Sequence, residues 1–138
     1  MELDDITGTI IDASMRLHDR LGPGLLESVY EIILASVLER RGLDVQRQCS
    51  VTFTYDGVTF DDGFRVDLVV ERCVLVELKS VEQMAKVHSK QLLTYLRLTN
   101  LRVGLLLNFG APTMKDGLKR VVNDLPPSSS SLRVNRPN

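Results

Sequence analysis

The sequence has no long hydrophobic run and few cysteines. No apolar stretch approaches the roughly 18 residues that cross a bilayer, and the first ten residues are acidic where a secretory signal would be basic. Cys49 and Cys73 lack both the paired spacing of a zinc site and the density of a disulfide-stapled domain. The sequence therefore predicts a cytoplasmic protein with reduced thiols and no membrane partner.

The chain also lacks an excess of charge of either sign. Its formal net charge is −1, so the molecule as a whole does not attract nucleic acid, and such binding would need a local basic patch. The candidates for a basic patch are Arg65, Lys86, Lys90, Arg97, Lys119 and Arg120. Alternatively, these residues are scattered surface charges, and the sequence fits both interpretations equally well.

No internal repeat is visible, and the composition is that of an ordinary globular domain. With 43% hydrophobic and 25% charged residues, the chain is able to bury a sizeable core. Residues 125–138 are rich in Pro, Ser and Asn and cannot build a core of their own. We therefore expect a single domain over residues 1–124 and a disordered tail over residues 125–138.

Hydrophobic patterning predicts alternating helical and extended segments. Helices are expected over residues 3–21, 25–42, 81–99 and 113–122, and strands over residues 51–55, 64–70, 74–79 and 103–108. Asp56-Gly57 is a strong hairpin signal after the first strand. This order of elements predicts an α/β fold in which helices flank a mixed β-sheet of about four strands.

Three charged residues interrupt the most apolar strands. If Val70 pairs with Val74 across the short turn, the register places Asp67 opposite Glu77. Carboxylates about 5 Å apart repel unless a cation lies between them, and Mg²⁺ is commonly held by one or two carboxylates. Lys79 shares the strand face of Glu77. The alternative, a solvent-exposed sheet face, fits less well because the flanking residues are almost continuously apolar.

Several segments together carry a family resemblance. They are Gly24-Leu-Leu-Glu27-Ser-Val-Tyr30-Glu31, Arg65-Val-Asp67, Val-Glu77-Leu-Lys79, His88-Ser-Lys-Gln91-Leu-Leu-Thr-Tyr95-Leu and Gly104-Leu-Leu-Leu-Asn108-Phe-Gly. The chain resembles the PD-(D/E)xK nuclease superfamily and, within it, the small stand-alone GxxExxheR family. This resemblance covers most of residues 5–122 and implies a restriction-endonuclease-like core. One departure is Ile32, which stands where the family's name has Arg.

The resemblance implies a catalytic metal site. Asp67 and Glu77 would bind Mg²⁺, with Mn²⁺ as an alternative, and the backbone carbonyl of Leu78 would be a further ligand. Lys79 would activate the attacking water and stabilise the developing charge. Glu27 would complete the metal site from its helix, unless it serves only to stabilise the positive end of the helix dipole.

Further candidates lie on the two helices beside the strands. Glu31, one turn after Glu27, either substitutes for it or is simply solvated. Gln91 and Tyr95 share one helix face, and the resemblance implies that Gln91 orients the lysine or a phosphate. For His88, a packing or surface role is at least as plausible as a functional one. The candidates for contact with nucleic acid are Tyr95, Lys90, Arg65 and His88.

Two functions from different classes fit these features. The first is a metal-dependent nuclease that hydrolyses phosphodiester bonds, with DNA as the expected substrate. The second is a catalytically inactive binding module that keeps the nuclease fold and acts in a DNA-processing assembly. Chemistry on a smaller nucleotide would use the same site. A homodimer is a further expectation, since many nucleases of this type pair to cut two strands.

Overall fold

The structure, a computed structural model, describes residues 1–124 and 133–135. Within these residues the chain alternates between helices and strands in nearly the predicted order. The elements are α1 (Leu3–Leu21), α2 (Glu27–Arg40), β1 (Val45–Tyr55), β2 (Val58–Val70), β3 (Val74–Lys79), α3 (Lys86–Thr99), β4 (Val103–Asn108), α4 (Met114–Gly117), β5 (Leu118–Val122) and β6 (Arg133–Asn135).

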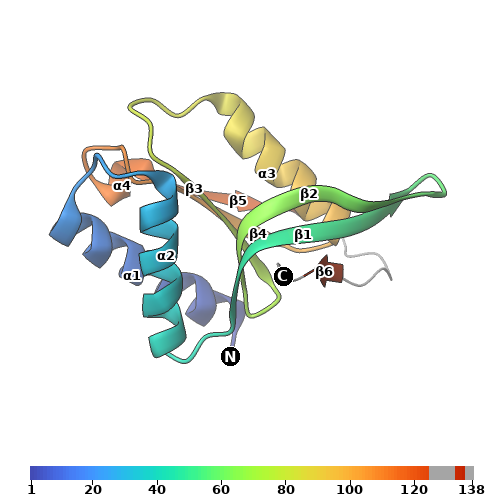
Figure 1. Ribbon diagram of the computed structural model, residues 1–138, viewed down its shortest axis with the longest axis horizontal. Coiled ribbons are helices and arrows are strands. Elements are labelled where there is room, and N and C mark those ends of the chain that lie inside the picture. Colours follow the sequence, from blue (N-terminus) through green and yellow to red (C-terminus); the bar gives the residue numbers. More distant parts are fainter. Residues whose placement is uncertain (125–132, 136–138) are drawn as a thin grey trace.

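The strands form one mixed sheet in the order β5-β4-β3-β2-β1-β6 (Figure 1). β3 and β4 are parallel, and every other neighbouring pair is antiparallel. A parallel pair needs a long crossover connection, and α3 provides it. The predicted α/β fold, with a mixed sheet flanked by helices, is confirmed.

Helices cover both faces of the central strands (Figure 1). α1 and α2 form the larger core with one set of strand residues, which includes Val74 and Val76 of β3. α3 forms the smaller core on the other face, which includes Leu75 of β3. A strand covered on both faces has no solvent side, which explains why these strands are almost continuously apolar in sequence. No helix within residues 1–124 and 133–135 is long and apolar enough to span a membrane.

The predicted last helix, residues 113–122, is wrong over its second half. Only Met114–Gly117 is helical, with Thr113 capping it by accepting a hydrogen bond from the Asp116 amide. Leu118–Val122 is strand β5 and pairs antiparallel with β4. Without β5, the buried strand β4 would leave a row of unpaired backbone groups at its edge, and this tertiary requirement overrides the local pattern.

The remaining differences concern element ends. α2 begins at Glu27 and ends at Arg40, α3 begins at Lys86, and β1 and β2 are longer than expected. The sheet therefore has six strands among the described residues, against about four predicted. Of the expected tail, residues 125–132 and 136–138 lie outside the described part of the chain, and Arg133–Asn135 forms β6 against β1.

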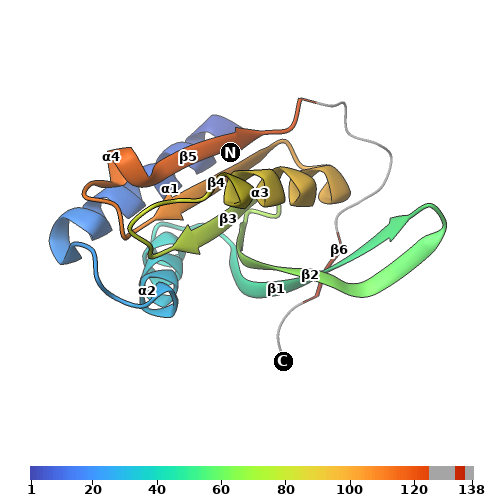
Figure 2. The ribbon, with the colours of Figure 1, turned by 90° about the horizontal axis from the view of Figure 1, so that it is seen from above.

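The β1–β2 hairpin extends beyond the body of the protein, as Figure 2 shows from above. Its turn is Asp56-Gly57, as predicted, and both residues have positive φ, +50° and +77°. A β-bulge after Val51 shifts the register between the inner and outer parts of the hairpin. We call the outer part, residues 52–63, the arm.

Candidate active site

The site begins where β2 and β3 diverge. The two strands pair from Val70 and Val74 as far as Leu68 and Val76, in the predicted register, and the pairing then ends although both strands continue. The next positions are Asp67 on β2 and Glu77 on β3. We call this opening the fork.

Side-chain hydrogen bonds replace backbone pairing in the fork. The Asp67 amide donates to Glu77 Oε1 at 3.2 Å, and the Leu78 amide donates to Asp67 Oδ2 at 2.9 Å. The Leu78 side chain is buried in the larger core, so only its backbone faces the fork. The structure thus brings Asp67 and Glu77 together as the strand alternation predicted.

The electrostatics of the fork are unfavourable without a cation. Burial, and secondly the negative charge of Asp67, raise the pKa of Glu77 to about 9, against the smaller opposing effect of Lys79. Glu77 is therefore protonated at neutral pH in the metal-free protein. A divalent cation between the two carboxylates would oppose both causes of this shift.

The backbone around Lys79 is held firmly. Lys79 pairs with Asn108 of β4, and its carbonyl accepts a hydrogen bond from the Phe109 amide at 2.8 Å. The buried Asn108 side chain makes three bonds, accepting from the Val81 and Gly110 amides and donating to the Val81 carbonyl. Strand alternation then places the Lys79 side chain on the same face as Glu77.

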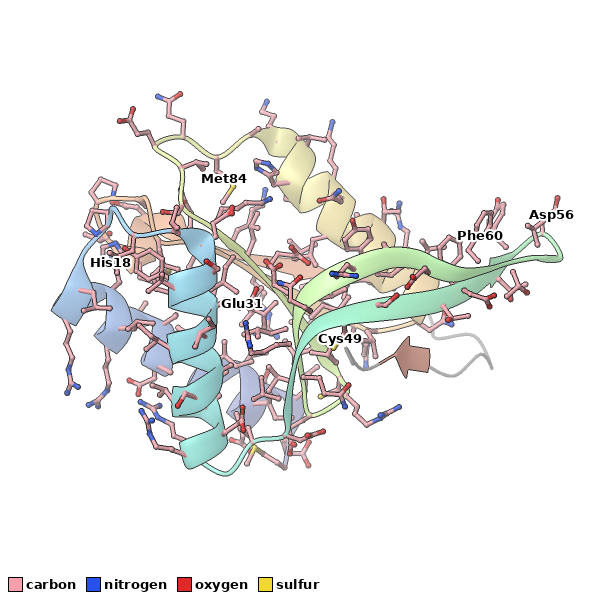
Figure 3. All side chains as sticks on the ribbon, viewed as in Figure 1. His18, Glu31, Cys49, Asp56, Phe60 and Met84 are labelled. Carbon is pink, nitrogen blue, oxygen red and sulfur yellow. The ribbon has the colours of Figure 1, made fainter. Side chains whose placement is uncertain are left out.

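Glu31 is part of this site rather than a solvated residue. It lies on the side of α2 that faces β1 and β2 (Figure 3) and is only 4% exposed. Arg47 of β1 forms an ion pair with Glu31 Oε2 at 3.1 Å, and the side-chain amide of Gln48 donates to Glu31 Oε1 at 2.6 Å. The pKa of Glu31 is raised, mainly by burial and further by the charge of Asp67, with Gln48 and Arg47 acting in the opposite direction.

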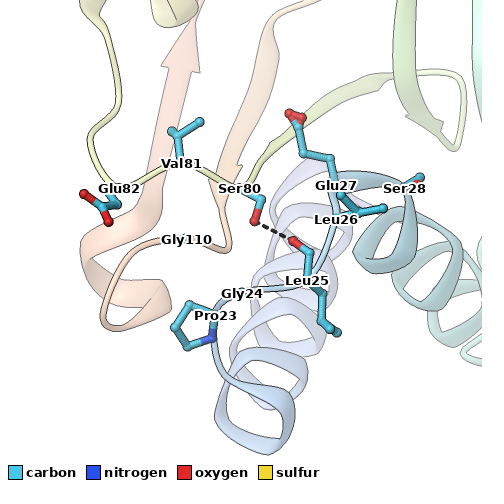
Figure 4. Close-up of a pocket in the computed structure, with 10 residues that line it drawn as sticks. All are labelled: Pro23, Gly24, Leu25, Leu26, Glu27, Ser28, Ser80, Val81, Glu82 and Gly110. Carbon is cyan, nitrogen blue, oxygen red and sulfur yellow. Dashed lines mark hydrogen bonds between the residues drawn. The ribbon is translucent and has the colours of Figure 1, made fainter.

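Glu27 lies at the start of α2. It is half-buried and lines an open groove of about 750 Å³ together with Ser80 and Gly110 (Figure 4). Ser80 directly follows Lys79 and donates a hydrogen bond to the Leu25 carbonyl at 2.7 Å. This bond ties the segment before α2 to the residue after β3, so the groove opens at the end of β3.

On α3, Tyr95 approaches the acidic pair. Its ring stacks on Phe64 at 4.0 Å, and the exposed Gln91 lies one helical turn before it. The pKa of Tyr95 is raised, first by burial and then by the charges of Glu77 and Asp67. Gln91 and Tyr95 thus lie on one face of α3, as predicted, and the roles assigned to them stay predictions.

The other predicted contacts with nucleic acid are spread over the surface near α3. Lys90 and Arg65 are exposed, whereas the half-buried His88 contacts Met84 Sδ through Nδ1 at 3.1 Å. The prediction that Arg120 belongs to a basic patch is wrong. Its guanidinium donates hydrogen bonds to Asp4 and Thr7 of α1. Adjacent residues of β5 point to opposite faces, so Arg120 lies on the α1 side.

Sequence reasoning missed Arg47 and Gln48. Continued inward from the Asp56-Gly57 turn without a bulge, the register would place Gln46 opposite Asp67. The β-bulge shifts β1 by two residues, so that Gln48 lies there instead. A signal for Glu31 was present, because it lies one helical turn after Glu27.

The fork has a partial set of metal donors. No group of three or more His, Cys, Asp or Glu side chains within residues 1–124 and 133–135 is arranged to hold a metal ion. Asp67 and Glu77 nevertheless fit a divalent cation, because Mg²⁺ is typically bound by one or two carboxylates, with waters and phosphates as its other ligands.

Comparison with known families agrees with this geometry. Residues 4–121 match the sequence model of the PD-(D/E)XK nuclease superfamily, and the chain belongs to that superfamily. Comparison with curated proteins and with solved structures gives no match.

Proposed function

We propose that the protein is a metal-dependent nuclease that hydrolyses phosphodiester bonds of DNA and belongs to the GxxExxheR type. The observation that carries this proposal is the facing pair Asp67 and Glu77, with Lys79 on the same strand face as Glu77. Superfamily membership makes a hydrolytic nuclease the expected class. The acidic pair and the lysine supply the groups that this chemistry needs.

Asp67, Glu77 and the Leu78 carbonyl would hold Mg²⁺, or Mn²⁺ in its place. The raised pKa of Glu77 supports this assignment, because the charge of Lys79 does not offset the effects of burial and of Asp67. When bound, the ion supplies Lewis acidity at the phosphate and lowers the pKa of water. Glu27 would complete the site from α2, either directly or through water, and it has access because it lines the open groove.

The protein's own residues supply the remaining functions. The Lys79 ammonium positions the attacking water and stabilises negative charge as it develops on the phosphate. Gln91 and Tyr95 bind the substrate beside the acidic pair. Tyr95 is close enough to Glu77 and Asp67 for their charges to raise its pKa. Lys90 and Arg65 provide exposed positive charge for phosphates, with His88 as a further contact.

Arg47 takes over the position of the family's helical arginine. Ile32, which replaces that arginine, is exposed and lines a surface groove that Arg47 also lines. Arg47 reaches this place from β1 and forms its ion pair with Glu31, the residue directly before Ile32. The guanidinium is thus present in this part of the site although it comes from a different element. The proposal also includes a cytoplasmic location and a homodimeric state.

The test is DNA cleavage by the purified protein. Circular plasmid, linear duplex and circular single-stranded DNA are incubated with Mg²⁺, Mn²⁺ or EDTA, beside Lys79→Ala and the matched control Lys115→Ala. Lys115 is exposed on α4. We expect metal-dependent cleavage that falls about 100- to 1,000-fold in Lys79→Ala and is unchanged in Lys115→Ala.

The opposite result is equally clear. A folded wild-type protein that cleaves none of these DNA forms with either metal contradicts the nuclease proposal. DNA binding without cleavage would instead indicate the inactive binding module. Retention of full activity by Lys79→Ala would show that cleavage does not arise at the fork.

A further inference from the structure

Gln48 has an unusual backbone conformation for a residue inside a strand. Its φ is +50°, whereas its neighbours Arg47 and Cys49 pair regularly with Leu68 and Val66 of β2. Residues other than glycine rarely adopt this left-handed conformation. Such strain persists only where surrounding contacts enforce it, and it is concentrated at functional sites.

At this positive φ, the side chain of Gln48 lies between two carboxylates. Gln48 Nε2 donates to Glu31 Oε1 at 2.6 Å and to Asp67 Oδ1 at 3.2 Å. An amide nitrogen carries two hydrogens, so both are used on carboxylates. Gln48 is thus a neutral donor placed between two negative groups from different elements, α2 and β2.

We propose that Gln48 is a positioning residue, which fixes the Asp67 carboxylate in the orientation that binds a divalent cation. This inference rests on the proposed function. Gln48 holds Asp67 Oδ1, while the Leu78 amide holds Oδ2. Hydrogen-bond partners of metal-binding carboxylates orient them, and their loss commonly weakens metal affinity about 10- to 100-fold.

Glu31 acts on Asp67 through Gln48. Its Oε2 is held by Arg47, and its Oε1 accepts from the same amide nitrogen that donates to Asp67. The order of contacts is therefore Arg47, Glu31, Gln48 and Asp67. In this arrangement Glu31 anchors the Gln48 side chain and does not itself bind the cation.

The first test is Mn²⁺ binding to Gln48→Gly, measured by calorimetry. Glycine adopts positive φ without strain, so this variant keeps the backbone conformation and removes the side chain with its amide group. We expect it to fold and to bind Mn²⁺ about 10- to 100-fold more weakly than wild type. Gln48→Asn, which tolerates positive φ but is one methylene shorter, should also bind weakly.

The matched control is Gln46→Gly. Gln46 is a buried glutamine on the same strand, and its amide contacts Cys49 rather than the acidic residues. It should keep wild-type affinity for Mn²⁺. An equal loss of affinity in Gln46→Gly would show that any disturbance of β1 weakens the site, which would overturn the role of Gln48.

A second test separates anchoring from direct binding. Glu31→Gln and Gln48→Gly are measured singly and together. If Glu31 acts only through Gln48, the double variant binds Mn²⁺ no more weakly than Gln48→Gly alone. Losses that multiply would show that Glu31 acts independently and would overturn the proposed order of contacts.

The outcomes also separate this inference from the proposed function. A wild-type protein that binds Mn²⁺ and cleaves DNA, beside a Gln48→Gly variant of equal affinity, overturns the inference and leaves the nuclease proposal standing. A wild-type protein that binds no Mn²⁺ overturns the metal site and this inference together.

Discussion

Adjacent parts of β2 and β3 differ in backbone pairing and in the polarity of their side chains. Residues 68–70 and 74–76 of β2 and β3 are apolar, fully paired and almost completely buried. One position further, at Asp67 and Glu77, the backbone pairing stops and carboxylates accept the amide hydrogen bonds. The paired segment stabilises the fold, whereas the fork buries an acidic pair whose ionised form is destabilised by burial and by mutual repulsion.

The difference shows how a small domain supports an unfavourable site. Buried apolar area contributes about 25 cal/mol per Å², and the paired segment contacts both hydrophobic cores. The fork is therefore supported by its rigid neighbours as well as by its own hydrogen bonds. Substitutions in the two segments should affect stability in opposite directions.

The largest effect on stability is expected in the paired segment. Leu68 is completely buried in the larger core, so Leu68→Ala should lower the free energy of unfolding by about 2–5 kcal/mol. Thermal unfolding monitored by circular dichroism measures this change. Leu68→Met, which conserves volume, should cost less than about 1.5 kcal/mol. A wild-type melting temperature in Leu68→Ala would contradict the comparison.

The fork should respond in the opposite way. The pKa of Glu77 is raised from 4.5 to about 9 in the folded protein, so its contribution to stability is present below pH 4.5 and is lost as the pH rises toward 9. In EDTA, Glu77→Gln should therefore stabilise the protein at pH 8, by an amount on the order of 2 kcal/mol. The gain should vanish at pH 4.

The control for this pH dependence is Glu39→Gln, which removes an exposed carboxylate from the same fold. Its melting temperature should follow wild type at every pH. If Glu77→Gln melts at or below the wild-type temperature at pH 8, the Glu77 carboxylate does not destabilise the metal-free protein. The fork and the paired segment would then contribute to stability in the same direction.

The sequence predicted the parts of the molecule that depend on local pattern. The ends of α1, β3 and β4 agree with the predicted ranges, and strand alternation with a short turn placed Asp67 opposite Glu77. The roles assigned to these residues stay predictions. The agreement is greatest where strands are buried on both faces, because there the apolar run has sharp ends.

Other features depend on tertiary contacts and could not be predicted. β5 is a strand because β4 needs a partner at its edge. Glu31 is buried because α2 packs close to Arg47 and Gln48 of β1. The place of Gln48 depends on a β-bulge, which the alternation of polar and apolar residues in β1 and β2 does not mark.

The smallest effect is expected in the arm, which extends the comparison to a third part of the same hairpin. Gly57 has φ +77° with no atom near the position of an added Cβ, so Gly57→Ala should cost only the backbone strain, about 1 kcal/mol. Gly57→Asn, which tolerates positive φ, should cost less. Because the bulge lies between the arm and the fork, both variants should keep the wild-type affinity for Mn²⁺ in calorimetry. A loss of metal affinity in Gly57→Ala would mean that strain in the arm passes through the bulge to Gln48 and Asp67, and that the fork is not independent of the arm.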